Sequence, residues 1–167
     1  MALTVVDAGV IIGLLDGQDA HHVAARAALA AARDRGDDLV LPAAAYAEIL
    51  VAPNRHGRGA VETVDRFLDA LPIRVEPIDR ATAARAAKLR AAHASVRLPD
   101  ALVIATALVL GADRLLTTDR RWPDVGVLVE YVTGSVRAPE PRLPLFASEA
   151  PDLAEHVDEA LGGFGER

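Results

Sequence analysis

Four acidic residues occupy positions where a carboxylate is well placed for chemistry. Asp7 directly follows the apolar run 3–6, and Asp119 lies just past the apolar run 115–117. Both runs have the apolar, partly β-branched character of buried strands. In open α/β sheets, ligands bind outside the carboxyl ends of the strands. We therefore expect both carboxylates to lie at a functional site.

Two further acids stand in strongly apolar stretches. Asp100 begins the apolar run 101–105, and Glu48 lies within the alanine-rich stretch 43–50. An ionised carboxylate among apolar side chains is costly unless it is paired or binds a cation. No arginine or lysine adjoins Asp7, Glu48 or Asp100 in the sequence. If the four carboxylates converge, an all-oxygen donor set without Cys or His predicts Mg²⁺ or Mn²⁺ as the bound ion.

Each acid also has an ordinary structural interpretation. Asp7 could cap a helix, and Asp100 could occupy the first turn of one, where acidic residues are favoured. Glu48 could point to solvent, and Asp119 could be a turn residue. The sequence alone leaves these interpretations open beside the functional one.

Composition limits the class of protein. The chain has 167 residues, 51% of them hydrophobic and 25% charged, as expected for one globular domain with an appendage. There is no cysteine, which excludes disulfides, zinc–thiolate sites and cysteine nucleophiles. The net charge of −6 is unlike that of a nucleic-acid coat protein, but it allows an acidic cleft with a basic rim. We find no secretory signal and no membrane span, and expect a cytoplasmic protein with no membrane partner.

Strand and helix patterns alternate along the first 132 residues. The pattern predicts strands at 3–6, 39–41, 73–75, 114–117 and 127–129, and helices at 10–15, 22–35, 42–51, 61–71, 80–92 and 100–110. Residues 53–59, with a proline, two glycines and two arginines, are expected to form a basic loop. Alternating strands and helices predict an α/β fold with a small, mainly parallel sheet covered on both faces.

Four segments together resemble the motifs of PIN-domain nucleases. They are the strand and first acid at 5–12, the second acid at 47–50, the third-acid helix at 98–107 and the closing strand with its T-x-D element at 115–121. Their order and spacing are similar to the VapC-type toxins of bacterial toxin–antitoxin systems, over about residues 3–132. The chain departs from the family in two places. Gly9 stands where the family often has Ser, Thr or Asn, and the chain continues beyond the usual toxin length.

The resemblance implies a PIN-like three-layer α/β/α sandwich and a Mg²⁺-dependent endoribonuclease, with Mn²⁺ as a second suitable ion. Asp7, Asp100 and Asp119 would hold the metal, with Glu48 as a further ligand or an orienting group. Thr117 would brace the Asp119 carboxylate. Expected partners are an RNA substrate, a cognate antitoxin and a second copy of the chain. Positive charge for the substrate would come from five residues, Arg55, Arg58, Arg97, Arg120 and Arg121.

The chain after Val132 has a different character. Residues 133–167 form a proline-rich, acidic C-terminal extension, distinct from the nuclease-like domain at 1–132. Residues 152–161 have the pattern of a short acidic helix. Disorder is one interpretation, and docking onto this or a neighbouring subunit, as an antitoxin peptide would dock on a basic groove, is the other.

Three other functions are alternatives to this interpretation, and the sequence argues against the last of them. Some PIN-domain nucleases act on structured DNA, and the same four acids would serve that reaction. A degenerate, non-enzymatic binding module is a second alternative, which the acidic net charge and Gly9 keep open. A phosphatase with an aspartyl nucleophile would need a D-x-D pair after the first strand, and Gly9 occupies the second position.

Overall fold

A five-stranded parallel sheet forms the centre of the computed structural model, which describes residues 2–134. The strands are β1 (Leu3–Val6), β2 (Asp38–Pro42), β3 (Ile73–Glu76), β4 (Arg114–Thr117) and β5 (Leu128–Tyr131), in the order β3-β2-β1-β4-β5. Every neighbouring pair is parallel, and Val5 of the central strand lies opposite Val40 and Leu115. The predicted mainly parallel sheet is thereby confirmed. The extension was predicted at 133–167, and its residues 135–167, including the predicted acidic helix, lie outside the described residues.

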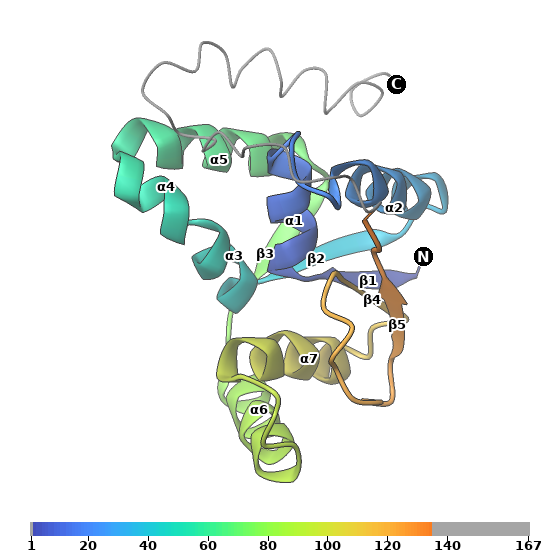
Figure 1. Ribbon diagram of the computed structural model, residues 1–167. Coiled ribbons are helices and arrows are strands. Elements are labelled where there is room, and N and C mark those ends of the chain that lie inside the picture. Colours follow the sequence, from blue (N-terminus) through green and yellow to red (C-terminus); the bar gives the residue numbers. More distant parts are fainter. Residues whose placement is uncertain (1, 135–167) are drawn as a thin grey trace.

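Helices cover both faces of the sheet and make three layers (Figure 1). They are α1 (Ala8–Leu15), α2 (His22–Asp34), α3 (Ala43–Ile49), α4 (Val51–His56), α5 (Arg58–Ala70), α6 (Arg80–Ala92) and α7 (Leu98–Leu110). α6 and α7 lie together on one face, and α1, α2 and α5 lie on the other (Figure 1). None of the described helices is long and apolar enough to cross a lipid bilayer.

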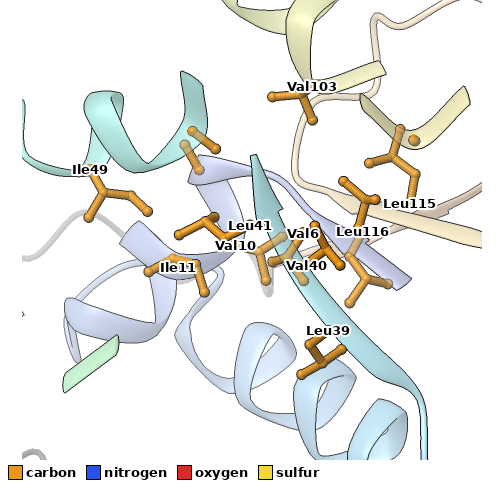
Figure 2. Close-up of a cluster of buried hydrophobic side chains, with 14 of the residues drawn as sticks. Val6, Val10, Ile11, Leu39, Val40, Leu41, Ile49, Val103, Leu115 and Leu116 are labelled. Carbon is orange, nitrogen blue, oxygen red and sulfur yellow. The ribbon is translucent and has the colours of Figure 1, made fainter. Parts of the chain in front are cut away.

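The core lies where the central strands meet these helices. Val5, Val6, Leu115 and Leu116 are fully buried, as expected for parallel strands covered on both faces. Figure 2 shows Val10 and Ile11 of α1 packing close to these strands, with Val103 of α7 at the edge of the same cluster. Fully burying one such side chain contributes about 1.5–3 kcal/mol, so this cluster holds β1 and β4 firmly in place.

Local chemistry sets the ends of the two helices that carry acids. α1 begins at Ala8, two residues earlier than predicted, because Asp7 Oδ1 accepts a hydrogen bond from its backbone N–H at 2.8 Å. α7 begins at Leu98 with Pro99 in its first turn, where a missing N–H costs nothing. It ends at Gly111, whose φ of +64° is the left-handed conformation that glycine adopts readily. Asp7 and Asp100 thus stand at helix N-termini.

The predicted basic loop at 53–59 is wrong. α4 runs to His56 and α5 starts at Arg58, so Gly57 alone separates the two helices. Gly57 has a φ of +101°, which an L side chain rarely adopts, and it turns the chain. Pro53 does not break α4 because it lies in the first turn, where helical N–H groups have no partner inside the helix. Arg55 and Arg58 therefore stand on helices and not on a loop.

Candidate active site

A pocket of about 360 Å³ opens where β1 and β4 end. All four acids singled out in the sequence line it, together with two arginines and three uncharged residues. The lining residues are Asp7, Gly9, Glu48, Arg97, Pro99, Asp100, Thr118, Asp119 and Arg121. Since β1 and β4 are adjacent and parallel, their carboxyl ends meet at one edge of the sheet and carry Asp7 and Asp119 with them.

Asp7 is the most buried and most constrained acid. Its residue is 8% exposed, its Oδ1 accepts from the Ala8 N–H, and its Oδ2 accepts from the Thr117 hydroxyl at 2.8 Å. Its own N–H donates to Leu116 O at 2.9 Å, which ties the end of β1 to β4. Both carboxylate oxygens therefore have a fixed direction at the floor of the pocket.

Burial raises the pKa of Asp7 from 3.8 to about 6. The hydrogen bonds from Thr117 and Ala8 lower it, and the nearby charges of Asp100 and Glu48 raise it further. The net direction means that desolvation and like charge outweigh the two donors. A cation in the pocket would reverse this balance by favouring the charged form.

Asp100 stands in the first turn of α7 and is half-buried. Desolvation and the charge of Asp119 raise its pKa, while a hydrogen bond from the Arg97 N–H and the charges of Arg97 and Arg121 oppose the rise. Asp100 and Asp7 thus have raised pKa values in one pocket, which is the pattern expected at a functional site.

Asp119 is paired with an arginine. Arg121 donates from Nε to Oδ1 at 2.8 Å and from a terminal nitrogen to Oδ2 at 2.6 Å, a two-pronged contact with both carboxylate oxygens. The Arg121 N–H also donates to Oδ1 at 2.9 Å. These hydrogen bonds hold the pKa of Asp119 below its ordinary value.

The prediction that Thr117 braces the Asp119 carboxylate is wrong. The buried Thr117 hydroxyl donates to Asp7, and it accepts only the backbone N–H of Asp119, at 3.1 Å. The reason is the sheet: Thr117 ends β4, next to the end of β1, and its side chain faces across to Asp7. Thr117 therefore connects the two acids: its hydroxyl donates to the Asp7 carboxylate and accepts from the Asp119 N–H.

Glu48 lines the pocket but is exposed. The prediction that Glu48 lies among apolar side chains was wrong, because α3 buries Ala45 and Ile49 and exposes Ala47 and Glu48. Its apolar sequence neighbours therefore do not surround it in space. Glu48 lines the pocket as an exposed residue, close enough to Asp7 for its charge to raise the pKa of that acid.

The five arginines proposed for the substrate fall into two groups. Arg97 and Arg121 line the pocket. Arg120 is exposed and does not line it, and Arg55 and Arg58 lie on α4 and α5, also outside the lining. The structure therefore brings two of the five to the acids.

The carboxylates of the pocket are the candidate ligands for a metal ion. Within residues 2–134, no three acidic or histidine side chains stand close enough to hold an ion as they are placed. In this arrangement, Arg121 donates to both oxygens of Asp119, and both oxygens of Asp7 accept hydrogen bonds. The chemistry of the set nevertheless fits a hard divalent cation: the four donors are carboxylates, and burial, together with the charge of neighbouring acids, raises the pKa of Asp7 and Asp100.

Sequence reasoning did not single out Thr118 as a pocket residue. Nothing in the local pattern separates it from Thr117, its neighbour in the same strand end. Only the structure shows that Thr118 lines the pocket beside Gly9, which lies on α1.

The chain is similar to a known protein family in sequence and to a solved structure in fold. The family model for the PIN domain matches residues 4–128. A solved chain from a toxin–antitoxin complex of Klebsiella pneumoniae has a similar fold, with a TM-score of 0.56 at 22% sequence identity, over 72% of this chain and 88% of that one. No curated protein matches the chain in sequence. The family match spans most of the described residues and includes all four acids, so the chain belongs to the PIN-domain family.

Proposed function

We propose that this protein is a Mg²⁺-dependent endoribonuclease and the toxin of a type II toxin–antitoxin pair. One observation carries the proposal: four carboxylates and two arginines line a single pocket of about 360 Å³ at the end of the central strands. Membership of the PIN-domain family and a fold like that of a chain from a toxin–antitoxin complex support it.

In this proposal, Asp7, Asp100 and Asp119 hold the ion, and Glu48 joins them as a ligand or orients a bound water. Mg²⁺, or Mn²⁺, would supply a water of lowered pKa and stabilise negative charge on the phosphate. Thr117 keeps Asp7 pointing into the pocket through its 2.8 Å hydrogen bond. Asp119 would serve as a ligand in place of its two side-chain hydrogen bonds from Arg121, and the Arg121 guanidinium would then be available to bind the phosphate.

Arg97 and Arg121 are the best placed to bind the substrate, since phosphate affinity comes largely from cationic side chains. Arg55, Arg58 and Arg120 would contact the RNA farther from the scissile bond. Cognate antitoxin and a second copy of the chain are the proposed protein partners, and the cytoplasm is the proposed location. The extension at 133–167 is proposed as a separate, proline-rich segment.

The decisive test compares Asp100→Asn with Asp69→Asn, the same chemical change on an exposed acid of α5 that does not line the pocket. Each variant is assayed for cleavage of single-stranded RNA and tRNA in Mg²⁺. Asp100→Asn should lose at least about 100-fold in rate, because even residues that only orient metal ligands are worth roughly 10- to 100-fold. Asp69→Asn should retain wild-type activity, and equal activity of the two variants would sink the assignment.

The same assay separates the alternatives. Cleavage of flap or branched DNA in preference to RNA would make the protein a structure-specific DNA nuclease. A chain that binds RNA, gains no thermal stability from Mg²⁺ and cleaves nothing would be a binding module.

A further inference from the structure

Gly9 leaves a space that another residue fills. A Cβ built on Gly9 would lie closer than 3.0 Å to Oγ1 of Thr118, a separation that real Cβ atoms essentially never show. The Cβ and Cγ2 atoms of Thr118 would lie 3.4 and 3.6 Å away. All three near atoms belong to Thr118, and its hydroxyl is the nearest. The hydroxyl of residue 118 therefore occupies the place where a side chain at position 9 would begin.

Thr118 lines the same pocket as the four acids. Thr118 precedes Asp119 directly, Gly9 follows Asp7 by two residues, and both Gly9 and Thr118 line the pocket. Thr118 is half-buried, and residues 2–134 offer its hydroxyl no hydrogen-bond partner. By contrast, the neighbouring Thr117 uses its hydroxyl twice, toward Asp7 and the Asp119 N–H. Of the two threonines, only Thr118 has a hydroxyl available to a ligand.

A hydroxyl adds something that the charged residues of the pocket lack. Ionised carboxylates only accept hydrogen bonds, and guanidinium groups only donate them, whereas a hydroxyl does both and carries no charge. Four carboxylates repel a phosphate, so every donor in the pocket counts toward holding one. The two arginines are the charged donors, and Arg121 is engaged by Asp119.

We propose that Thr118 is a substrate-contacting residue, whose hydroxyl donates a hydrogen bond to a non-bridging oxygen of the phosphodiester, and that Gly9 lacks a side chain so that this hydroxyl can occupy the space. The proposal rests on the proposed function, since it assumes a phosphodiester substrate. In this proposal, the hydroxyl that contacts the phosphodiester comes from Thr118, just after β4, and not from a side chain at position 9 in the first turn of α1.

The test uses two pairs of variants, one at position 118 alone and one at positions 9 and 118 together, and the members of each pair differ in whether they carry the hydroxyl. Thr118→Val replaces the hydroxyl by a methyl group, and Thr118→Ser retains it. Gly9→Ser with Thr118→Ala returns a hydroxyl from the opposite side, whereas Gly9→Ala with Thr118→Ala fills the space with carbon alone. Gly9→Ala alone, beside an intact Thr118, is the steric control and should lower the thermal unfolding temperature.

Two readouts are measured: the Kd for single-stranded RNA with Ca²⁺ replacing Mg²⁺, and kcat and KM for cleavage in Mg²⁺. Thr118→Val and the double variant Gly9→Ala with Thr118→Ala should weaken RNA binding and lower kcat/KM by roughly 10-fold or more, because a hydrogen bond to a charged group usually contributes that much. Thr118→Ser and the double variant Gly9→Ser with Thr118→Ala, which keep a hydroxyl, should stay near wild type. Thermal unfolding identifies any variant that fails to fold, and the other pair of variants then still shows whether the hydroxyl matters.

Equal RNA binding by the hydroxyl-free and hydroxyl-bearing variants would overturn the proposal and leave Thr118 as a space filler. That result is distinct from failure of the proposed function, in which wild type neither binds nor cleaves RNA and Asp100→Asn changes nothing. The latter outcome overturns both.

Discussion

Replacing Asp7 by Asn should make the protein more stable at neutral pH while abolishing its activity. The buried Asp7 carboxylate has a pKa of about 6 in the folded chain against an ordinary value of 3.8. Folding therefore favours the protonated form, and keeping Asp7 ionised at pH 7 has a cost. At about 1.4 kcal/mol per pH unit, the separation corresponds to about 3 kcal/mol.

The pH dependence follows from the sign of the shift. Between pH 3.8 and about 6, the folded chain binds the Asp7 proton more tightly than the unfolded chain does, so this residue's contribution to stability falls as the pH rises. Above about pH 6 the full cost is present. Asn at position 7 keeps an oxygen to accept the Ala8 N–H and has no charge to desolvate, but its Nδ2 replaces the oxygen that accepts from the Thr117 hydroxyl. The unfolding free energy of Asp7→Asn relative to wild type should therefore rise by about 2 kcal/mol between pH 4 and pH 7, set against a pH-independent loss of about 1 kcal/mol for the Thr117 hydrogen bond.

The assay is urea unfolding of wild type and Asp7→Asn in the absence of divalent ions, from pH 4 to pH 8, with the difference in unfolding free energy plotted against pH. Asp119→Asn is the matched control with the opposite sign. Arg121 lowers the pKa of Asp119, so that carboxylate stabilises the fold at neutral pH and its contribution is lost as pH falls. A difference curve for Asp7→Asn that stays flat, or that falls with rising pH, would refute the reasoning. Added Mg²⁺ should stabilise wild type more than Asp7→Asn.

Three further predictions follow from the contacts of the site and core. Thr117→Val should lower the unfolding free energy by about 1–3 kcal/mol and raise the pKa of Asp7 further, because a buried carboxylate loses its donor; urea unfolding checks the first effect and Thr117→Ser is the control. Arg121→Gln should tighten Mn²⁺ binding, measured by electron paramagnetic resonance, because it frees both oxygens of Asp119. It should also weaken RNA binding, and looser Mn²⁺ binding would contradict the idea that Arg121 competes with the ion for Asp119. Leu115→Ala should lower the unfolding free energy by about 2–5 kcal/mol, because this fully buried side chain leaves a cavity, and an effect below 1 kcal/mol would be inconsistent with its place in the core.

The sequence by itself determined the alternation of strands and helices and the positions of the four acids. Apolar runs that end at Asp7 and just before Asp119 predicted strand ends, and parallel strands with ends at one edge bring such residues together. Buried strands and capped helices are encoded by residues a few positions apart, so a local pattern is enough to find them. The same holds for the apolar helix that carries Asp100.

Only the tertiary structure decided what each side chain contacts. The partner of the Thr117 hydroxyl is Asp7, 110 positions away in the chain, and the space at Gly9 is filled by Thr118. The exposure of Glu48 likewise depends on which face of α3 meets the sheet and α7, which apolar neighbours in sequence do not reveal. These features arise from the pairing of β1 with β4 and from helix packing. Because such contacts join residues far apart in the chain, no pattern within one segment encodes them.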